Sequence, residues 1–440
     1  MIFLEFMILY STNHQSPDVS LEEAVFRGLP PDNGLYMPHI IPTLPDSFFE
    51  NIDKMSITDI AFEVSKALLS DDISDEDLKM IVNRAINFEA PVVEIEKNTY
   101  VLELFHGPSM AFKDFGARFM ASLMSYFLQK SQKDIHILVA TSGDTGGAVA
   151  QGFYKTSGIK VTILYPTGKV SDIQEKQLTT LGENITALEI DGTFDDCQAL
   201  VKAAFLDKDL SSKFNLASAN SINISRLIPQ SFYYFNAFAE LKRAGNTKPV
   251  VFCVPSGNFG NLSAGLIAQR MGLPVKMFVA ATNVNNVVPR YLEKGKYEPI
   301  PSKETISNAM DVGNPSNFVR MRLLAGDAHE QVVTHIAGDF SDDAATRKAM
   351  KEVFDRTGYV MCPHTAVAYL GLKSYTDTLD EEVAGILLST AHYAKFLEVV
   401  EETLGTSVEV PERLSALLSK EKVSIRMDKE FVDFKNYLLS

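Results

Sequence analysis

Residues 250–271 read VVFCVPSGNFGNLSAGLIAQRM, and this stretch decides the predicted fold class. A continuous apolar run, a glycine-rich turn and then a helical pattern are typical of a buried parallel strand that leads into a helix. A turn at that position directs free backbone N–H groups, and the positive end of the helix dipole, at an anion. Its glycines allow close backbone approach and its asparagines add donors: Gly257, Gly260, Asn258 and Asn261. The turn has neither the ATP-binding nor the full dinucleotide-binding pattern. Because it also fits an ordinary strand-to-helix turn, the motif alone leaves phosphate binding open.

The same alternation runs through much of the chain. Apolar runs that predict strands, at 101–105, 135–140, 161–165, 185–190 and 275–281, alternate with helical patterns. The first 95 residues differ, because they predict a short first strand and amphipathic helices at 21–29, 55–69 and 75–88. We therefore expect an α/β fold whose parallel sheets are covered on both faces.

Composition narrows the class of protein. The 440 residues carry 41 lysines and arginines against 56 aspartates and glutamates, a formal net charge of −15. This negative net charge argues against non-specific nucleic-acid binding, although the charge of a local pocket can still be positive. Cys197, Cys253 and Cys362 are far apart, so we expect buried thiols in a reducing cytoplasm, with no disulfides and no metal site. No apolar run reaches the length of a membrane span, and MIFLEFMILY lacks the features of a signal peptide. Translation could start at Met1 or at Met7.

Two further motifs carry chemistry. TSGDTGG, at 141–147, offers hydroxyls and amides suited to a carboxylate, although helix capping explains the same residues. Lys113 lies near a predicted helix start between Phe112 and Phe115. A lysine among aromatic rings can lose hydration and have its pKa lowered, as a Schiff-base amine requires, but most such lysines reach solvent. An imine-forming lysine, a phosphate-binding turn and a carboxylate-binding loop together are the parts of a pyridoxal-phosphate enzyme.

Seven motifs, in order, resemble those of the threonine synthase family in its longer-chain branch. They are LFHGPSMAFKDFGARFM (104–120), TSGDTGGAVA (141–150), LYPTGKVSDIQEKQ (164–177), SANSINISR (218–226), PSGNFGN (255–261), AATNVNNVVPR (280–290) and STAHYAKF (389–396). The resemblance runs from about Tyr10 to beyond Phe396. It implies a fold type II pyridoxal-phosphate enzyme, related to the tryptophan synthase β-chain, with the cofactor in a cleft between two α/β domains. It also implies a cytoplasmic lyase that converts O-phospho-L-homoserine and water to L-threonine and phosphate by β,γ-replacement, the last step of threonine biosynthesis.

The resemblance assigns cofactor roles residue by residue. Lys113 corresponds to the lysine that binds pyridoxal phosphate covalently and then acts as a base. The turn that holds the cofactor phosphate corresponds to Gly257, Asn258, Phe259, Gly260 and Asn261. Thr390 corresponds to the hydroxyl that faces the pyridine nitrogen. Because a neutral hydroxyl does not hold the ring protonated, the ring would be a milder electron sink.

The resemblance also assigns substrate residues. The 141–147 loop is similar to a substrate-carboxylate loop, with Ser142, Gly143, Asp144 and Thr145 as the candidates. Asp144 replaces the asparagine of sister families, so its role stays open between the cofactor side and a helix cap. The substrate phosphate needs a second cationic site, for which the candidates are Lys169, Arg226, Ser221 and Asn223. A surface ion pair is the alternative for each of the two cations.

Other features of these motifs concern local structure. Either proton handling or a structural role fits His106 and His392, and we expect His364 to be structural. Tyr393 stands where the family usually has proline, which predicts a less rigid loop beside Thr390.

The length predicts two or three domains. The resemblance divides the chain into an N-terminal region at 1–95, a large cofactor domain at 96–116 and 226–440, and an inserted α/β domain at 117–225 that closes over substrate. Two alternatives remain: a β-eliminating dehydratase or synthase of the same fold, and a catalytically silent protein that binds a phosphorylated metabolite. The dehydratase would not need the second phosphate site, and the retained Lys113 argues against the silent protein. The oligomeric state, monomer or homodimer, is left open.

Overall fold

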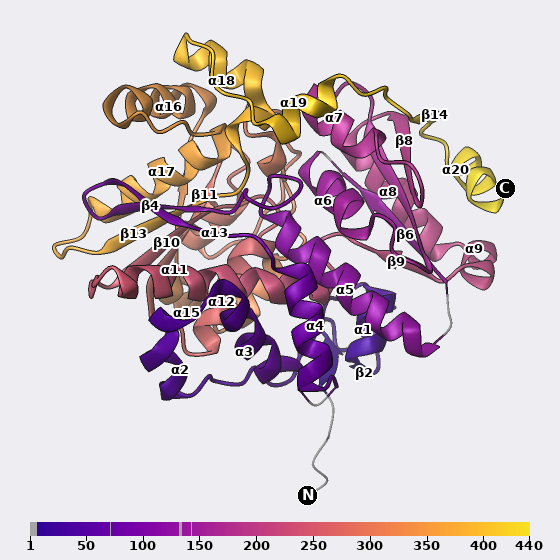
Figure 1. Cartoon of the computed structure of the whole chain (residues 1–440), viewed down its shortest axis with the longest axis horizontal. Coiled ribbons are helices and arrows are strands. Elements are labelled where there is room, and N and C mark those ends of the chain that lie inside the picture. Colours follow the sequence, from indigo (N-terminus) through magenta and orange to yellow (C-terminus); the bar gives the residue numbers. More distant parts are fainter. Residues whose placement is uncertain (1–6, 71, 132–133, 142) are drawn as a thin grey trace, which may run out of the picture.

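The computed structural model describes residues 7–70, 72–131, 134–141 and 143–440. These residues form three sheets surrounded by helices, with the larger parallel sheet on the left of Figure 1 and the smaller one on the right. The α/β class with mainly parallel sheets is confirmed.

The larger sheet has six strands in the order β12-β11-β10-β13-β5-β4. All neighbours are parallel except β4, which pairs antiparallel with β5. The strands are β4 (Val92–Glu96), β5 (Thr99–Glu103), β10 (Val250–Pro255), β11 (Val275–Thr282), β12 (Ile336–Phe340) and β13 (Ala384–Ser389).

The smaller sheet has five strands, all parallel, in the order β14-β8-β7-β6-β9. They are β6 (Ile135–Ala140), β7 (Ile159–Pro166), β8 (Ile185–Asp191), β9 (Leu216–Ser218) and β14 (Ile425–Asp428).

The helices follow in chain order. Those before the smaller sheet are α1 (Leu21–Arg27), α2 (Asp46–Asn51), η1 (Ile52–Lys54), α3 (Ile57–Leu69), α4 (Asp75–Ala85) and α5 (Lys113–Ser131). Those between its strands are α6 (Asp144–Phe153), α7 (Asp172–Thr179), α8 (Phe194–Leu206) and α9 (Lys208–Lys213). The next are α10 (Ile224–Leu227), η2 (Ile228–Ser231), α11 (Phe232–Arg243), α12 (Gly260–Arg270), α13 (Val287–Lys294), η3 (Asn308–Met310), α14 (Phe318–Leu324) and α15 (His329–His335). The last are α16 (Asp343–Thr357), α17 (Pro363–Thr376), η4 (Tyr393–Phe396), α18 (Leu397–Leu404), α19 (Glu412–Leu418) and α20 (Phe431–Leu439).

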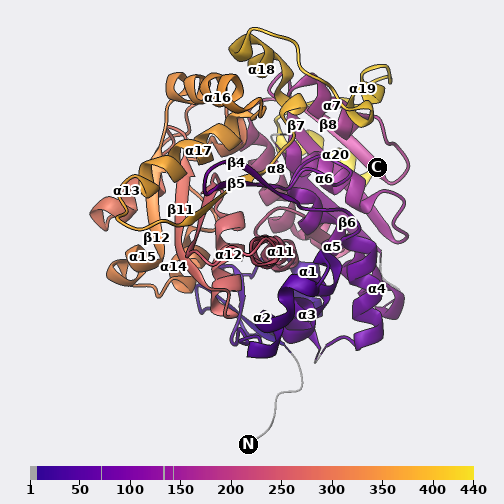
Figure 2. The same ribbon diagram turned by 60° about the vertical axis from the view of Figure 1, so that its left-hand side comes forward.

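Strand β10 shows why its sequence is apolar without a break. Phe252 and Val254 belong to the hydrophobic cluster that contains α11 and α12, whereas Val251 and Cys253 belong to the cluster that contains α16 and α17. Figure 2 shows these helix pairs on either side of the sheet. Because successive strand residues point to opposite faces, a strand covered on both faces must be apolar at every position.

The N-terminal region forms the third sheet and the helices predicted for it. Strands β1 (Ile8–Ser11), β2 (Val19–Ser20) and β3 (Tyr36–Pro38) pair antiparallel. Helices α1, α3 and α4 each follow a serine whose hydroxyl accepts a backbone N–H three residues later: Ser20, Ser56 and Ser74. Such N-caps satisfy donors that the first helical turn leaves free.

The C-terminal segment departs from the expected division of the chain. That division assigned 226–440 to the large domain, but β14 adds to the edge of the smaller sheet beside β8. Arg426 pairs with Asp191 at 2.8 Å, and Phe434 and Leu438 of α20 lie in the same hydrophobic cluster as α8. The last strand and helix therefore complete the smaller sheet, because they cover apolar surface that it would otherwise expose.

Two further expectations concern the burial of the cysteines and the presence of membrane-spanning helices. Cys197, Cys253 and Cys362 are all buried as expected, and burial raises the pKa of the Cys197 thiol to about 12. Within the described ranges, no helix combines the length and the apolar character that crossing a bilayer requires.

Candidate active site

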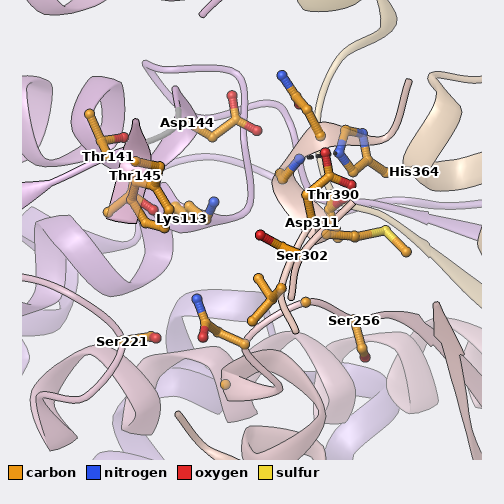
Figure 3. A pocket seen from close by; sticks show the side chains of 18 of the residues that line it. Lys113, Thr141, Asp144, Thr145, Ser221, Ser256, Ser302, Asp311, His364 and Thr390 are labelled. Carbon is orange, nitrogen blue, oxygen red and sulfur yellow. Dashed lines mark hydrogen bonds between the residues drawn. The ribbon is translucent and has the colours of Figure 1, made fainter. Parts of the chain in front are cut away.

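The two parallel sheets open into one cavity of about 560 Å³ (Figure 3). Ala140, Pro166 and Pro255, the last residues of β6, β7 and β10, all line it. In open α/β sheets, ligands bind beyond the carboxyl ends of the strands. The predicted site residues that line the cavity are Lys113, Asp144, Thr145, Lys169, Ser221, Arg226, Gly257, Asn258, Phe259, Gly260, Asn261 and Thr390. Gly143 and Asn223 are not among the lining residues, and Ser142 lies outside the described residues.

Lys113 is the first residue of α5, two residues later than the predicted helix start near Ala111, and its half-buried amine points into the cavity. Burial lowers the pKa of this amine to about 8; the charge of Asp144 opposes the shift, and the charges of Arg226 and Lys395 reinforce it. A lysine with such a pKa supplies neutral, nucleophilic amine near neutral pH. The Phe112 N–H donates to the Thr390 carbonyl at 2.8 Å, so the backbone holds Lys113 close to the segment that carries Thr390.

The turn after β10 fits an anion. Phe259 has the left-handed φ of 60°, and α12 begins at the next residue, so its N-terminus opens onto the cavity. Tyr233 and Tyr234 donate their hydroxyls to Asn261 Oδ1 at 2.6 and 2.7 Å. The Asn261 Nδ2 donor is thereby directed elsewhere, and it is buried without a partner among the described residues. A Cβ on Gly257 would lie 2.8 Å from the Ala309 carbonyl, so the turn depends on glycine there.

Thr390 and His364 lie together on another side of the cavity (Figure 3). Thr390 follows β13 and is 7% exposed. His364 accepts the Ala309 N–H at 3.2 Å. Burial lowers the pKa of His364 to about 4, with Asp144 opposing the shift and Lys113 and Lys395 reinforcing it. His364 is therefore a neutral acceptor that fixes the backbone facing the turn at 255–261.

Of the two roles left open for Asp144, the structure contradicts the helix cap. Helix α6 begins at this residue itself, and its N-cap, Gly143, makes no side-chain capping bond. The Asp144 carboxylate instead accepts from Gln174 Nε2 at 2.9 Å and pairs with Lys395 Nζ at 2.6 Å. Burial would raise the pKa of Asp144, but these contacts and the charge of Lys113 hold it well below its usual value. Asp144 is thus an ionised carboxylate that lines the cavity, with its Oδ1 held by Gln174 and Lys395.

The other residues of this loop mostly hold the loop itself. Thr141 Oγ1 accepts the N–H groups of Gly143 and Gly146 at 3.0 and 2.8 Å. Gly143 has a φ of 137°, and a Cβ there would lie 2.6 Å from the Gln174 side chain. Thr145 lines the cavity from the first turn of α6 (Figure 3).

The candidates for the second anion site separate into two groups. Arg226 is 2% exposed and lines the cavity; its Nη1 donates to the Ala219 carbonyl, and its Nε has no partner among the described residues. Burial lowers the pKa of Arg226 to about 10. Lys169 lines the cavity mouth and pairs with Glu304 at 3.5 Å, with both side chains largely exposed.

Ser221 and Asn223 have different roles. Ser221 Oγ accepts from Asn317 Nδ2 at 3.3 Å at the cavity wall. Asn223 is fully buried away from the cavity; its Oδ1 caps α10 by accepting the Ser225 N–H, and its Nδ2 donates to the Val25 carbonyl. An asparagine at a helix start makes this bond readily, which is a signal that the sequence contains.

Three comparisons with known proteins agree. A family described as pyridoxal-phosphate dependent enzymes matches residues 88–390, and threonine synthase N-terminal and C-terminal families match 9–86 and 365–438. The chain is 44% identical over 433 residues to threonine synthase of Haemophilus influenzae, with 98% of this chain and all of that one covered. The chain belongs to the threonine synthase family.

Solved structures of family members support this assignment. Threonine synthase from Escherichia coli superimposes with a TM-score of 0.91 at 42% identity, over 98% of this chain and 99% of that one. The pyridoxal-phosphate-bound threonine synthase from Brucella melitensis superimposes with a TM-score of 0.90 at 32% identity, over 98% of each chain. The predicted fold type II class, the family and the cofactor pyridoxal phosphate are confirmed.

The cavity of this threonine synthase family member fits the cofactor on its own contacts. The buried, unpartnered donor of Asn261 lies at the N-terminus of α12, where a phosphate would satisfy it. The Lys113 amine lines the same cavity.

The sequence analysis assigned no role to two residues that the structure places at the site. Lys395 lies inside the quoted motif 389–396 and yet is completely buried. Asp311 lines the cavity, and its carboxylate accepts from Thr305, Asn283 and Asn285, the asparagines of the motif at 280–290. Nothing in the sequence around Asp311 indicates this network, because its two asparagine partners lie 28 and 26 residues earlier in the chain.

Proposed function

We propose that this chain converts O-phospho-L-homoserine and water to L-threonine and phosphate, in the cytoplasm, as the last step of threonine biosynthesis. The observation that carries the proposal is that Lys113 and the turn at 255–261 line one cavity, which Arg226 also lines as a separate, partly unpartnered cation. The cofactor phosphate and the substrate phosphate would each need such a partner.

We assign the cofactor to three groups of this chain. Lys113 would bind it covalently, and the backbone N–H groups of residues 257–261 with Asn261 Nδ2 would hold its phosphate. The Thr390 hydroxyl would face the ring nitrogen without protonating it. When bound, pyridoxal phosphate supplies an electron sink for the charge left when protons are removed from carbon.

Lys113 would move the protons. Once the substrate amine has displaced it from the cofactor, its amine is free, and a lowered pKa lets it accept the proton from the α-carbon. Removal of a β-proton would then let the phosphate leave from the γ-carbon, which takes up a proton to become the methyl group. Water would add its hydroxyl at the β-carbon, and a proton would return to the α-carbon. Lys113 finally returns to the cofactor and releases threonine.

The remaining candidates would bind the two anionic ends of the substrate. Arg226 is suited to clamp the phosphate, with Ser221 and Lys169 nearby on the cavity wall and mouth. The loop that contains Gly143 and Thr145 would bind the carboxylate through its amides and hydroxyls. Asp144 would not contact the carboxylate, because its charge is already matched by Lys395.

We also propose that the smaller α/β unit closes over the substrate. Its expected boundaries, 117–225, are extended here by the C-terminal strand and helix, which pack on it. Closure would exclude bulk water from the reacting groups.

The variant Lys113→Ala tests the assignment. It is expected to lose all turnover and the visible absorption band of the covalently held cofactor. The control Lys351→Ala removes an exposed lysine on α16 that pairs with Asp355, and it should keep both. Substantial turnover in Lys113→Ala would show that another group does this chemistry.

A further inference from the structure

A buried ion pair at the edge of the cavity joins the start of α6 to η4. Lys395 Nζ lies 2.6 Å from Asp144 Oδ1, and the side chains are 0% and 5% exposed. Every other ion pair among the described residues leaves at least one partner substantially accessible, as the Lys435–Asp207 pair does at 24% and 16%. Because burying two charges costs desolvation energy that their attraction barely offsets, stability alone is a poor reason to keep such a pair.

Hydrogen bonds hold both members of the pair in place. Gln174 Nε2 donates to the Asp144 carboxylate at 2.9 Å, and Ser171 Oγ donates to the Lys395 carbonyl at 2.9 Å. Lys395 Nζ and Gln177 Nε2 both donate to the Ser109 carbonyl at 2.9 Å. Ser171 is the N-cap of α7 and the two glutamines lie on it, so this helix braces the pair from the side of the smaller sheet.

The pair also sets the charge around Lys113. The ionised groups that act on this amine are Asp144 from α6, Arg226 from α10 and Lys395 from η4; His364 from α17 is neutral. Asp144 raises the pKa of Lys113, whereas Lys395 and Arg226 lower it. Lys395 and Lys113 are the two cations that lower the pKa of Asp144, so without Lys395 its carboxylate would interact with Lys113.

We propose that Lys395 and Asp144 are positioning residues: their ion pair fixes the start of α6 against η4 and keeps Asp144 from capturing the Lys113 amine. The inference rests on the proposed role of Lys113 as the cofactor lysine. It gives Asp144 a role that neither helix capping nor substrate contact supplies.

The test measures the Lys113 amine directly in cofactor-free protein. Trace acetylation with acetic anhydride over a range of pH, with the Lys113 peptide quantified by mass spectrometry, gives its titration curve. Lys395→Met should move the midpoint up by about one unit, because a nearby cation is lost, and Asp144→Asn should move it down by a similar amount. The midpoint of the double variant should return close to that of the wild-type protein. The control Lys351→Met should leave the midpoint unchanged.

Each outcome decides the matter. Opposite shifts that cancel in the double variant support the pair, whereas an unchanged midpoint, or shifts of both single variants in the same direction, overturns it. If Lys395→Met does not fold, the isosteric Asp144→Asn still tests the sign. Failure of the proposed function appears separately, as a cofactor band that survives in Lys113→Ala.

Discussion

The substitution Asn261→Asp tests the cofactor-phosphate site with little change in shape. The carboxylate can still accept the hydroxyls of Tyr233 and Tyr234, which now reach Asn261 Oδ1 at 2.6 and 2.7 Å. What disappears is the buried Nδ2 donor, which has no protein partner among the described residues. The variant should therefore fold and yet bind pyridoxal phosphate poorly.

The magnitude follows from that one donor. A hydrogen bond to a charged group contributes about 1.5–3 kcal/mol, and about 1.4 kcal/mol corresponds to a tenfold change in Kd. The lost donor alone predicts cofactor binding that is about 10- to 100-fold weaker. Repulsion between the new carboxylate and the phosphate acts in the same direction, so about tenfold is the smallest expected effect.

Titration of cofactor-free protein with pyridoxal phosphate, followed by visible absorption, measures the change. The matched control is Asn246→Asp, which replaces a half-buried asparagine that precedes β10, at the end of the strand away from the cavity. Cofactor affinity equal to that of the control would refute the assignment of Asn261 to the phosphate.

Three further predictions concern neighbouring residues. Arg226→Lys keeps the charge but loses the planar fork, so kcat/KM for O-phospho-L-homoserine should fall at least about tenfold in steady-state assays with cofactor affinity nearly unchanged; an unaltered kcat/KM would remove Arg226 from the substrate site. Gly257→Ala puts a Cβ 2.8 Å from the Ala309 carbonyl and should weaken cofactor binding by about 1–3 kcal/mol in the same titration, whereas wild-type affinity would mean that the turn yields. Burial raises the pKa of Asp114 to about 6 against the hydrogen bonds from Ser109. Between about pH 4 and about pH 6 the folded protein then holds a proton that the unfolded chain has released, so the free energy of unfolding should fall as pH rises through this window, by up to about 3 kcal/mol. Urea unfolding should show that Asp114→Asn lacks this fall, and equal pH dependence in both proteins would contradict it.

Local patterns in the sequence predicted most of the fold. The apolar strands and the turn at 255–261 depend on neighbours in the chain, and the structure has them where the patterns indicate. Strand β14 could not be found this way, because the segment 425–428 is short and its side chains are mostly exposed. It becomes a strand only through pairing with β8, which is distant in the chain.

The site residues divide in the same manner, into those that local motifs indicate and those that depend on distant contacts. Lys113 and Asn261 reach the cavity from the first turns of α5 and α12, and the motif that contains each one marks that helix start. Asp144 and Lys395 form a buried pair from two distant segments, and spacing along the chain does not encode that contact. Asn223 shows the opposite case, because a motif residue was assigned to substrate while its contacts make it a helix cap.

The most direct measurement is the release of phosphate and threonine from O-phospho-L-homoserine, with pyridoxal phosphate added and withheld. The account predicts equal amounts of both products, only with the cofactor, and little 2-oxo acid when threonine or serine is supplied instead. Turnover of threonine or serine without phosphate release from O-phospho-L-homoserine would contradict it and point to a dehydratase.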